Sequence, residues 1–119
     1  MKYARFLALL LLLVPALAAT ARAADRDESP RTITLTAKRF EFVPSTITLK
    51  KGETVRFLVT SEDVTHGLFL RPLKIDTDLT PGKTEELTVT PQSAGTFTAI
   101  CHHFCGSGHG GMKLTVIVE

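Results

Sequence analysis

The chain has 119 residues, a formal net charge of +2 and a hydrophobic content of 44%. This length fits one domain at most, and no basic stripe of the kind that binds nucleic acid runs along the sequence. We therefore expect a single domain that does not bind nucleic acid.

The first 23 residues have the pattern of a secretory signal peptide. Lys2 and Arg5 precede an unbroken apolar run over residues 6–13, and small residues follow. An Ala-Arg-Ala sequence ending at Ala23 fits an A-x-A cleavage site, so we expect cleavage there. The alternative is an uncleaved anchor, but the apolar run is shorter than the ~20 residues of a membrane span.

The remaining sequence divides into a polar lead segment, residues 24–30, and a domain, residues 31–119. The signal holds three of the 14 basic residues and none of the 12 acidic ones, which leaves 11 against 12 and a net charge near −1. We expect a periplasmic or otherwise exported domain with no membrane span after cleavage. The sequence does not indicate an oligomeric state.

Alternating polar and apolar residues predict β-strands throughout this domain. The predicted strands are residues 32–36, 46–50, 54–60, 86–90, 95–100 and 112–118. Turn residues separate them, and residues 71–80 fit either a short strand or a crossover loop. Six to eight short strands in about 90 residues indicate an all-β fold, a Greek-key β-sandwich.

Most of the residues that can bind metal lie between the last two strands. Residues 101–112 read CHHFCGSGHGGM, and they contain both cysteines, three of the four histidines and one of the two methionines of the chain. The fourth histidine, His66, follows the strand that ends near residue 60. Loops at one end of a sandwich lie close together, so we expect His66 to reach this segment.

Thiolate, imidazole and thioether together favour copper, because zinc makes little use of a thioether. A mononuclear blue-copper site would use His66, His109, Met112 and one cysteine. The second cysteine would then not be a ligand. Cys101 and Cys105 can instead both bridge two copper ions. Each ion then takes one imidazole and one weak donor, which is either Met112 or a backbone carbonyl between the cysteines. A disulfide between the cysteines is the non-metal alternative.

The spacing Cys101-x3-Cys105-x3-His109-x2-Met112, with His66 upstream, resembles the dinuclear copper (CuA) domain of cytochrome c oxidase subunit II. It is also similar to the corresponding domain of nitrous oxide reductase. The resemblance implies a cupredoxin fold, Cys101 and Cys105 as bridging ligands and His66 and His109 as terminal ligands. It further implies Met112 and the backbone carbonyl of His103 as weak ligands.

The chain departs from that family at His103, where oxidase subunits usually carry a glutamate. It also lacks tryptophan and a C-x-x-C-H haem motif. We therefore expect a free-standing electron-transfer protein of the CuA type, and not an enzyme, with a cytochrome or oxidase-type redox partner. A copper chaperone that passes copper to an acceptor is the alternative, and His102 and His103 are expected at the rim of the site.

Overall fold

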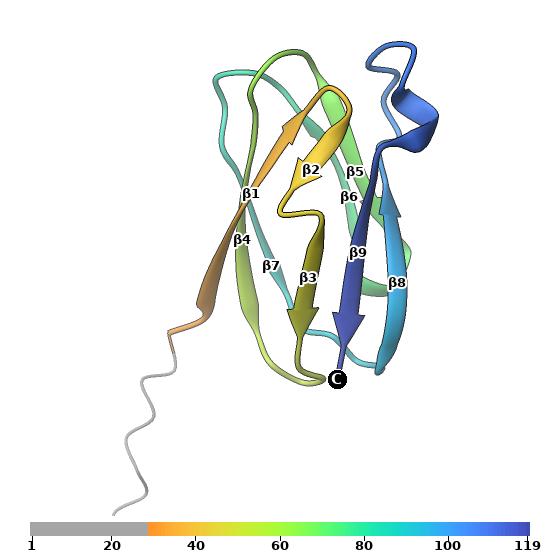
Figure 1. The fold of residues 1–119 in the computed structure, drawn as a ribbon. Helices are drawn as coiled ribbons and strands as arrows, with labels where there is room; N and C mark the ends of the chain where they lie inside the picture. The colour runs from red at the N-terminus through yellow and green to blue at the C-terminus, as the bar shows by residue number, and fades with distance from the viewer. Residues whose placement is uncertain (1–28) are drawn as a thin grey trace, which may run out of the picture.

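The computed structural model describes residues 29–119, whose strands form two sheets packed face to face (Figure 1). The four-stranded sheet has the order β2-β1-β4-β7, and the five-stranded sheet has the order β3-β9-β8-β5-β6. The bounds are β1 (Arg31–Lys38), β2 (Glu41–Val43), β3 (Thr46–Leu49), β4 (Val55–Ser61), β5 (His66–Leu70), β6 (Ile75–Leu79), β7 (Glu85–Val89), β8 (Gly95–Ile100) and β9 (Lys113–Val118). The expected all-β sandwich is confirmed.

Side-chain alternation along the strands builds the core between the sheets. In β4, Val55, Phe57 and Val59 are buried while the residues between them are partly exposed, and β9 repeats the pattern from the opposite sheet. Burial of these side chains contributes about 1.5–3 kcal/mol each, before the opposing chain entropy is counted. The core therefore fixes which face of each strand points inward, and with it the register of the strand ends that carry the site.

The structure adds elements that the sequence analysis did not predict. Nine strands lie in the described part of the chain, against six to eight expected, because β2 and β5 were missed. Residues 71–80 contain both a 3-10 helix, η1 (Arg71–Leu73), and the strand β6. Residues 29–119 contain no α-helix, and none of their helices could cross a membrane.

The chain crosses between the sheets several times, which brings distant segments to one end of the sandwich. It passes from β4 in one sheet to β5 and β6 in the other, returns to β7, and crosses again to β8 and β9. The turns after β1 and β4 and the long segment after β8 all lie at the end opposite the C-terminus (Figure 1). His66 and residues 101–112 meet there, as expected.

Candidate metal centre

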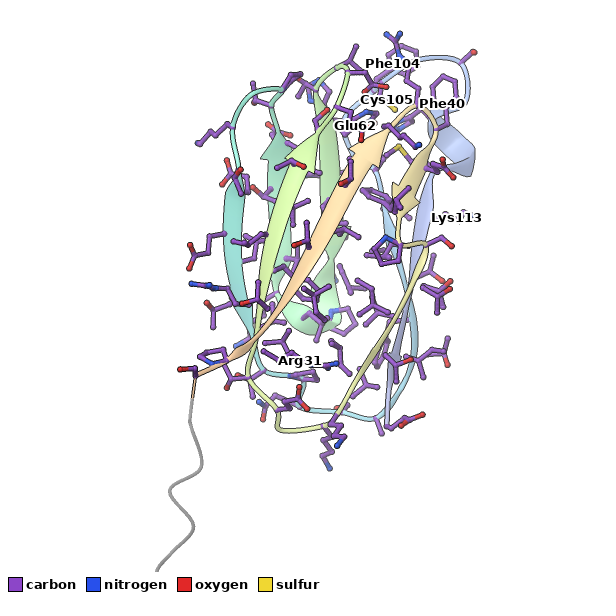
Figure 2. All side chains as sticks on the ribbon, turned by 60° about the vertical axis from the view of Figure 1, so that its left-hand side comes forward. Arg31, Phe40, Glu62, Phe104, Cys105 and Lys113 are labelled. Carbon is purple, nitrogen blue, oxygen red and sulfur yellow. The ribbon has the colours of Figure 1, made fainter. Side chains whose placement is uncertain are left out.

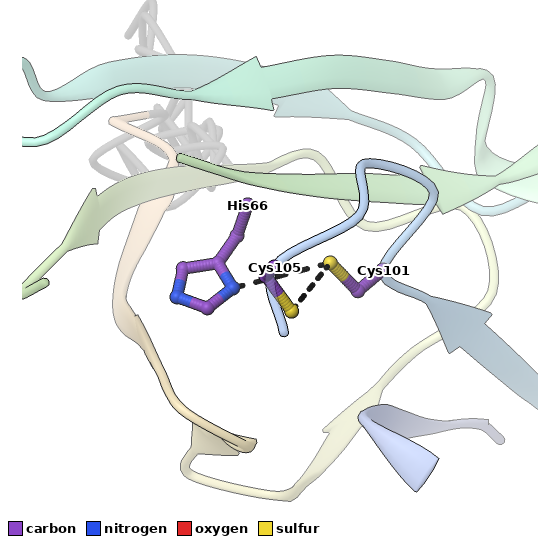
Figure 3. A group of neighbouring side chains, drawn as sticks. All are labelled: His66, Cys101 and Cys105. Carbon is purple, nitrogen blue, oxygen red and sulfur yellow. Dashed lines mark hydrogen bonds between the residues drawn. The ribbon is translucent and has the colours of Figure 1, made fainter. Parts of the chain in front are cut away.

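The two cysteines lie side by side in the interior at this end of the sandwich. Their Sγ atoms are 3.8 Å apart, and no disulfide joins them (Figure 3). Cys101 directly follows β8, and Cys105 lies four residues further on, where the chain has turned back toward β5. Both side chains are almost completely shielded from solvent, with exposed fractions of 3% and 4%. The structure therefore presents two buried thiols that face one another.

Each sulfur has its own imidazole neighbour. The Nδ1 atom of His66, the first residue of β5, lies 4.0 Å from Cys101 Sγ (Figure 3). The Nδ1 atom of His109, the first residue of the 3-10 helix η2 (His109–Gly111), lies 3.7 Å from Cys105 Sγ. His66 is fully buried, whereas His109 is half-buried. The two imidazoles therefore differ in their access to solvent.

Each sulfur also has one weaker donor beside it. The backbone oxygen of His103 lies 3.2 Å from Cys101 Sγ, and the Sδ atom of Met112 lies 3.9 Å from Cys105 Sγ. Met112 is 1% exposed, immediately before β9. The structure thus brings together all six residues named from the sequence, in two sets of one sulfur, one imidazole and one weak donor.

Asp63 holds the far side of the His66 ring. Its Oδ1 atom lies 2.7 Å from His66 Nε2, so Nε2 carries the hydrogen and leaves Nδ1 directed at Cys101. Asp63 also accepts backbone N–H bonds from Arg39 and Val64, both at 2.7 Å. Burial opposes ionisation, but these bonds and His66 together lower the pKa of Asp63 from 3.8 to about 2. Asp63 therefore joins the turn after β1 to the loop before β5 and orients the imidazole.

Two residues of the turn after β1 contact the segment that contains Cys105. Arg39 donates from Nε to the backbone oxygen of Cys105 at 3.0 Å. Phe40 covers two glycines of the ligand segment, because a Cβ atom on Gly106 or Gly108 would come within 2.9 or 2.4 Å of its ring. Phe40 and Cys105 lie together at the same end of the molecule (Figure 2).

The four glycines after Cys105, at positions 106, 108, 110 and 111, do not all have the backbone angles that favour glycine. Only Gly106 has a positive φ, at 136°. Gly108 has φ −90° and leaves space for the Phe40 ring, while Gly110 has open space around its Cα. Loop glycines near a site therefore serve two separate needs, conformation and close approach.

Burial makes the Cys105 thiol a weaker acid than an exposed thiol. Loss of solvent raises the pKa of the Cys105 thiol from 9.0 to about 11, and the neighbouring Cys101 adds to the rise although the Arg39 guanidinium opposes it. Cys105 is therefore a neutral thiol near pH 7. A metal ion that binds it as thiolate has to displace the proton.

The remaining side chains of the segment lie outside the donor set. His102 and His103 face β6, where their ring nitrogens approach Asp76 at 2.7 Å and Asp78 at 3.6 Å. Phe104 is 75% exposed, and its ring centroid lies 5.7 Å from that of His109, with the two rings tilted by 50°. Phe104 projects at the same end of the sandwich as Cys105 (Figure 2).

The donor set fits a soft metal. Donor atoms that share an ion at about 2.0–2.3 Å lie within ~4.6 Å of one another, and the five separations given above, 3.2–4.0 Å, meet this limit. His66, Cys101 and Cys105 alone form a group whose donor atoms all lie within 4.8 Å. Two thiols, two imidazoles and a thioether in a buried pocket select copper over harder cations.

Known proteins support this interpretation. Residues 6–116 match the family of the cupredoxin-like domain, and the chain belongs to this family. It is 42% identical over 73 residues to the probable cytochrome c oxidase subunit 2 of Streptomyces avermitilis, covering 61% of this chain and 23% of that protein. It is 31% identical over 88 residues to cytochrome c oxidase subunit 2 of Thermus thermophilus, covering 74% and 65%.

The fold has a counterpart among solved structures. The periplasmic domain of cytochrome oxidase subunit II of Bradyrhizobium japonicum superposes with a TM-score of 0.69 at 20% identity, covering 75% of this chain and 83% of that one. The chain spans less than two thirds of the two oxidase subunits compared above. The expected cupredoxin-like fold and the relation to oxidase subunit II are thus confirmed, and family membership implies copper binding.

Proposed function

We propose that this protein is an exported copper-binding electron-transfer domain with a dinuclear centre of the CuA type. The main support for this proposal is that the site contains two similar sets of donor atoms. Each buried sulfur has one Nδ1 atom and one weak donor of its own, within 3.2–4.0 Å. A single ion would use one of these two sets and leave a second buried cysteine without a role.

The proposed ligands are Cys101 and Cys105 as bridges, His66 and His109 as terminal donors, and Met112 and the His103 carbonyl as weak donors. When bound, two thiolate-bridged copper ions supply a one-electron carrier. The protein excludes water from the sulfurs by burial and fixes the His66 tautomer through Asp63. His66, Cys101 and Met112 lie at the ends of strands, and Arg39 holds the backbone at Cys105. A fixed donor set lowers the structural change that accompanies electron transfer.

Electrons would pass between this site and a partner at the end of the sandwich that carries it. His109 is the half-buried imidazole of the set, and the exposed Phe104 lies against it. We propose a cytochrome or oxidase-type redox protein as the partner, because the relatives are subunits of cytochrome c oxidase. The role is transfer of electrons and not catalysis.

Export rests on the N-terminal sequence and on the relatives. Residues 1–23 fit a cleaved signal and residues 24–30 a polar lead, although residues 1–28 lie outside the part of the chain that the structure describes. The related oxidase domain of Bradyrhizobium japonicum is described as periplasmic. We propose that the copper domain acts in the periplasm or is otherwise exported.

Copper loading followed by electron paramagnetic resonance tests the centre. Two copper ions per chain and a seven-line pattern, from one electron shared by two copper nuclei, are expected. One ion per chain with a four-line signal would instead establish the mononuclear alternative. Cys105→Ser should abolish the shared signal, and a variant that keeps two ions with the same spectrum would show that Cys105 is not a bridge.

A copper-handling role is the second candidate, and the surface beside the site favours it. His103 is 45% exposed and lines an open hollow of about 300 Å³ together with Cys105 and Phe104. An imidazole at the mouth of a thiol site suits the passage of copper in or out. Rapid exchange of copper with a soluble acceptor protein would support this role, whereas firm retention with fast redox cycling supports electron transfer.

A further inference from the structure

The two adjacent histidines, His102 and His103, face two aspartates on the neighbouring strand. We propose that this His-His pair docks the ligand segment onto β5 and β6, and that His102 is a positioning residue for the Cys101 half of the metal site. The docking itself is a property of the copper-free protein. Its effect on copper rests on the function proposed above.

The His102 side chain is held by both strands. Its Nε2 atom lies 2.7 Å from Asp76 Oδ1, and its ring stacks on Phe69 with centroids 5.8 Å apart and an interplanar angle of 28°. Phe69 of β5 and Asp76 of β6 are partners in the sheet register. The ring therefore bridges a registered pair, and sliding of the segment along the sheet would break both contacts.

Gly67 makes this close approach possible. A Cβ atom at position 67 would lie 2.0 Å from His102 Nδ1 and 2.9 Å from the backbone nitrogen of His103. The His102 ring thus lies directly over the Gly67 backbone, with Nδ1 packed against it and Nε2 bound to Asp76. Neither nitrogen is available to a metal, which explains why a histidine beside a ligand cysteine is outside the donor set.

The same contact controls two donor atoms. The Gly67 N–H donates to Cys101 Sγ at 3.3 Å, and the His103 carbonyl lies 3.2 Å from that sulfur. His103 is in turn drawn toward Asp78, the register partner of Gly67. His102 therefore sets the position of the sulfur before it and of the carbonyl after it. The Cys105 half is held separately, by Arg39 and Phe40.

The test compares His102→Gln and Asp76→Ala with the wild-type protein. Asp76 is 69% exposed, so its substitution leaves the core intact. Glu86→Ala is the matched control, because it removes an exposed carboxylate from an ion pair with Arg56 in the other sheet. The readouts are hydrogen exchange of the Gly67 amide in the copper-free protein and the half-time of copper transfer to a soluble chelator.

In both variants we expect Gly67 to exchange about 10-fold faster while β4 and β7 keep their protection, because local opening is independent of global unfolding. We expect copper transfer to accelerate about 10-fold, because loss of a group that supports a metal ligand typically lowers metal affinity about 10- to 100-fold. The control should match the wild type. Unchanged exchange at Gly67, or an equal rise in every strand, would overturn the proposal. Failure of the wild type to bind copper would refute the proposed function, while Gly67 exchange would still test the docking.

Discussion

Replacement of Asp63 by asparagine tests how the copper-free protein prepares His66 for metal binding. Asp63 accepts three hydrogen bonds at 2.7 Å, from His66 Nε2 and from the backbone N–H groups of Arg39 and Val64. Asp63→Asn keeps the size of the side chain but removes its charge. It also exchanges one accepting oxygen for an NH2 group, which cannot accept from the N–H that faces it. A protonated Asp63 likewise has only one carbonyl oxygen, so comparison of the two proteins at high and low pH separates the effect of the charge from that of the lost acceptor.

The magnitude follows from the pKa of Asp63. A pKa that falls from 3.8 to about 2 corresponds to about 2 kcal/mol of preference of the folded state for the carboxylate. The side chain is 32% exposed, so solvent screening reduces this value, and we expect Asp63→Asn to lower the free energy of unfolding by about 1 kcal/mol at pH 7.

The lowered pKa of Asp63 also determines how its contribution to stability changes with pH. Because the folded-state pKa is depressed, the contribution is complete above pH 3.8 and is lost as the pH falls through about 2. Urea unfolding of copper-free wild type and Asp63→Asn should therefore show a difference at pH 7 that shrinks toward pH 2. Glu62→Gln, one residue away and exposed, is the control and should show little change. An undiminished difference between wild type and Asp63→Asn at pH 2 would refute the electrostatic account.

Two further predictions concern the Cys105 half of the site. Burial raises the pKa of the Cys105 thiol to about 11, so between pH 9 and 11 this thiol ionises in the unfolded chain but not in the folded protein. Copper-free protein should therefore lose stability over this pH range, and Cys105→Ser should lose less. Equal losses in the two proteins would contradict the raised pKa. Gly108→Ala should destabilise the protein by about 1–3 kcal/mol in urea unfolding because its Cβ would lie 2.4 Å from the Phe40 ring, whereas Gly110→Ala meets open space and should not. In a Phe40→Ala background, Gly108→Ala should cause a smaller loss of stability. An undiminished loss would show that contact with the Phe40 ring is not its cause.

The sequence by itself determined the sandwich and the composition of the site. Alternation of polar and apolar residues is a local signal, so strands such as β4 and β9 could be predicted from their own residues. Cys101, Cys105, His109 and Met112 are close in sequence, so one turning segment had to bring them near one another. That His66 would join them followed from the way strand ends gather in a sandwich.

Only the tertiary structure decided how these donors are supported. β5 was missed because four of its five residues are buried, which removes the alternation, and β2 was missed because three residues are too few to show a period. The contact of His102 with Asp76 joins residues 26 positions apart, and that of Arg39 with Cys105 joins residues 66 apart. Such pairs depend on sheet register and on strand crossings, so a local pattern cannot specify them.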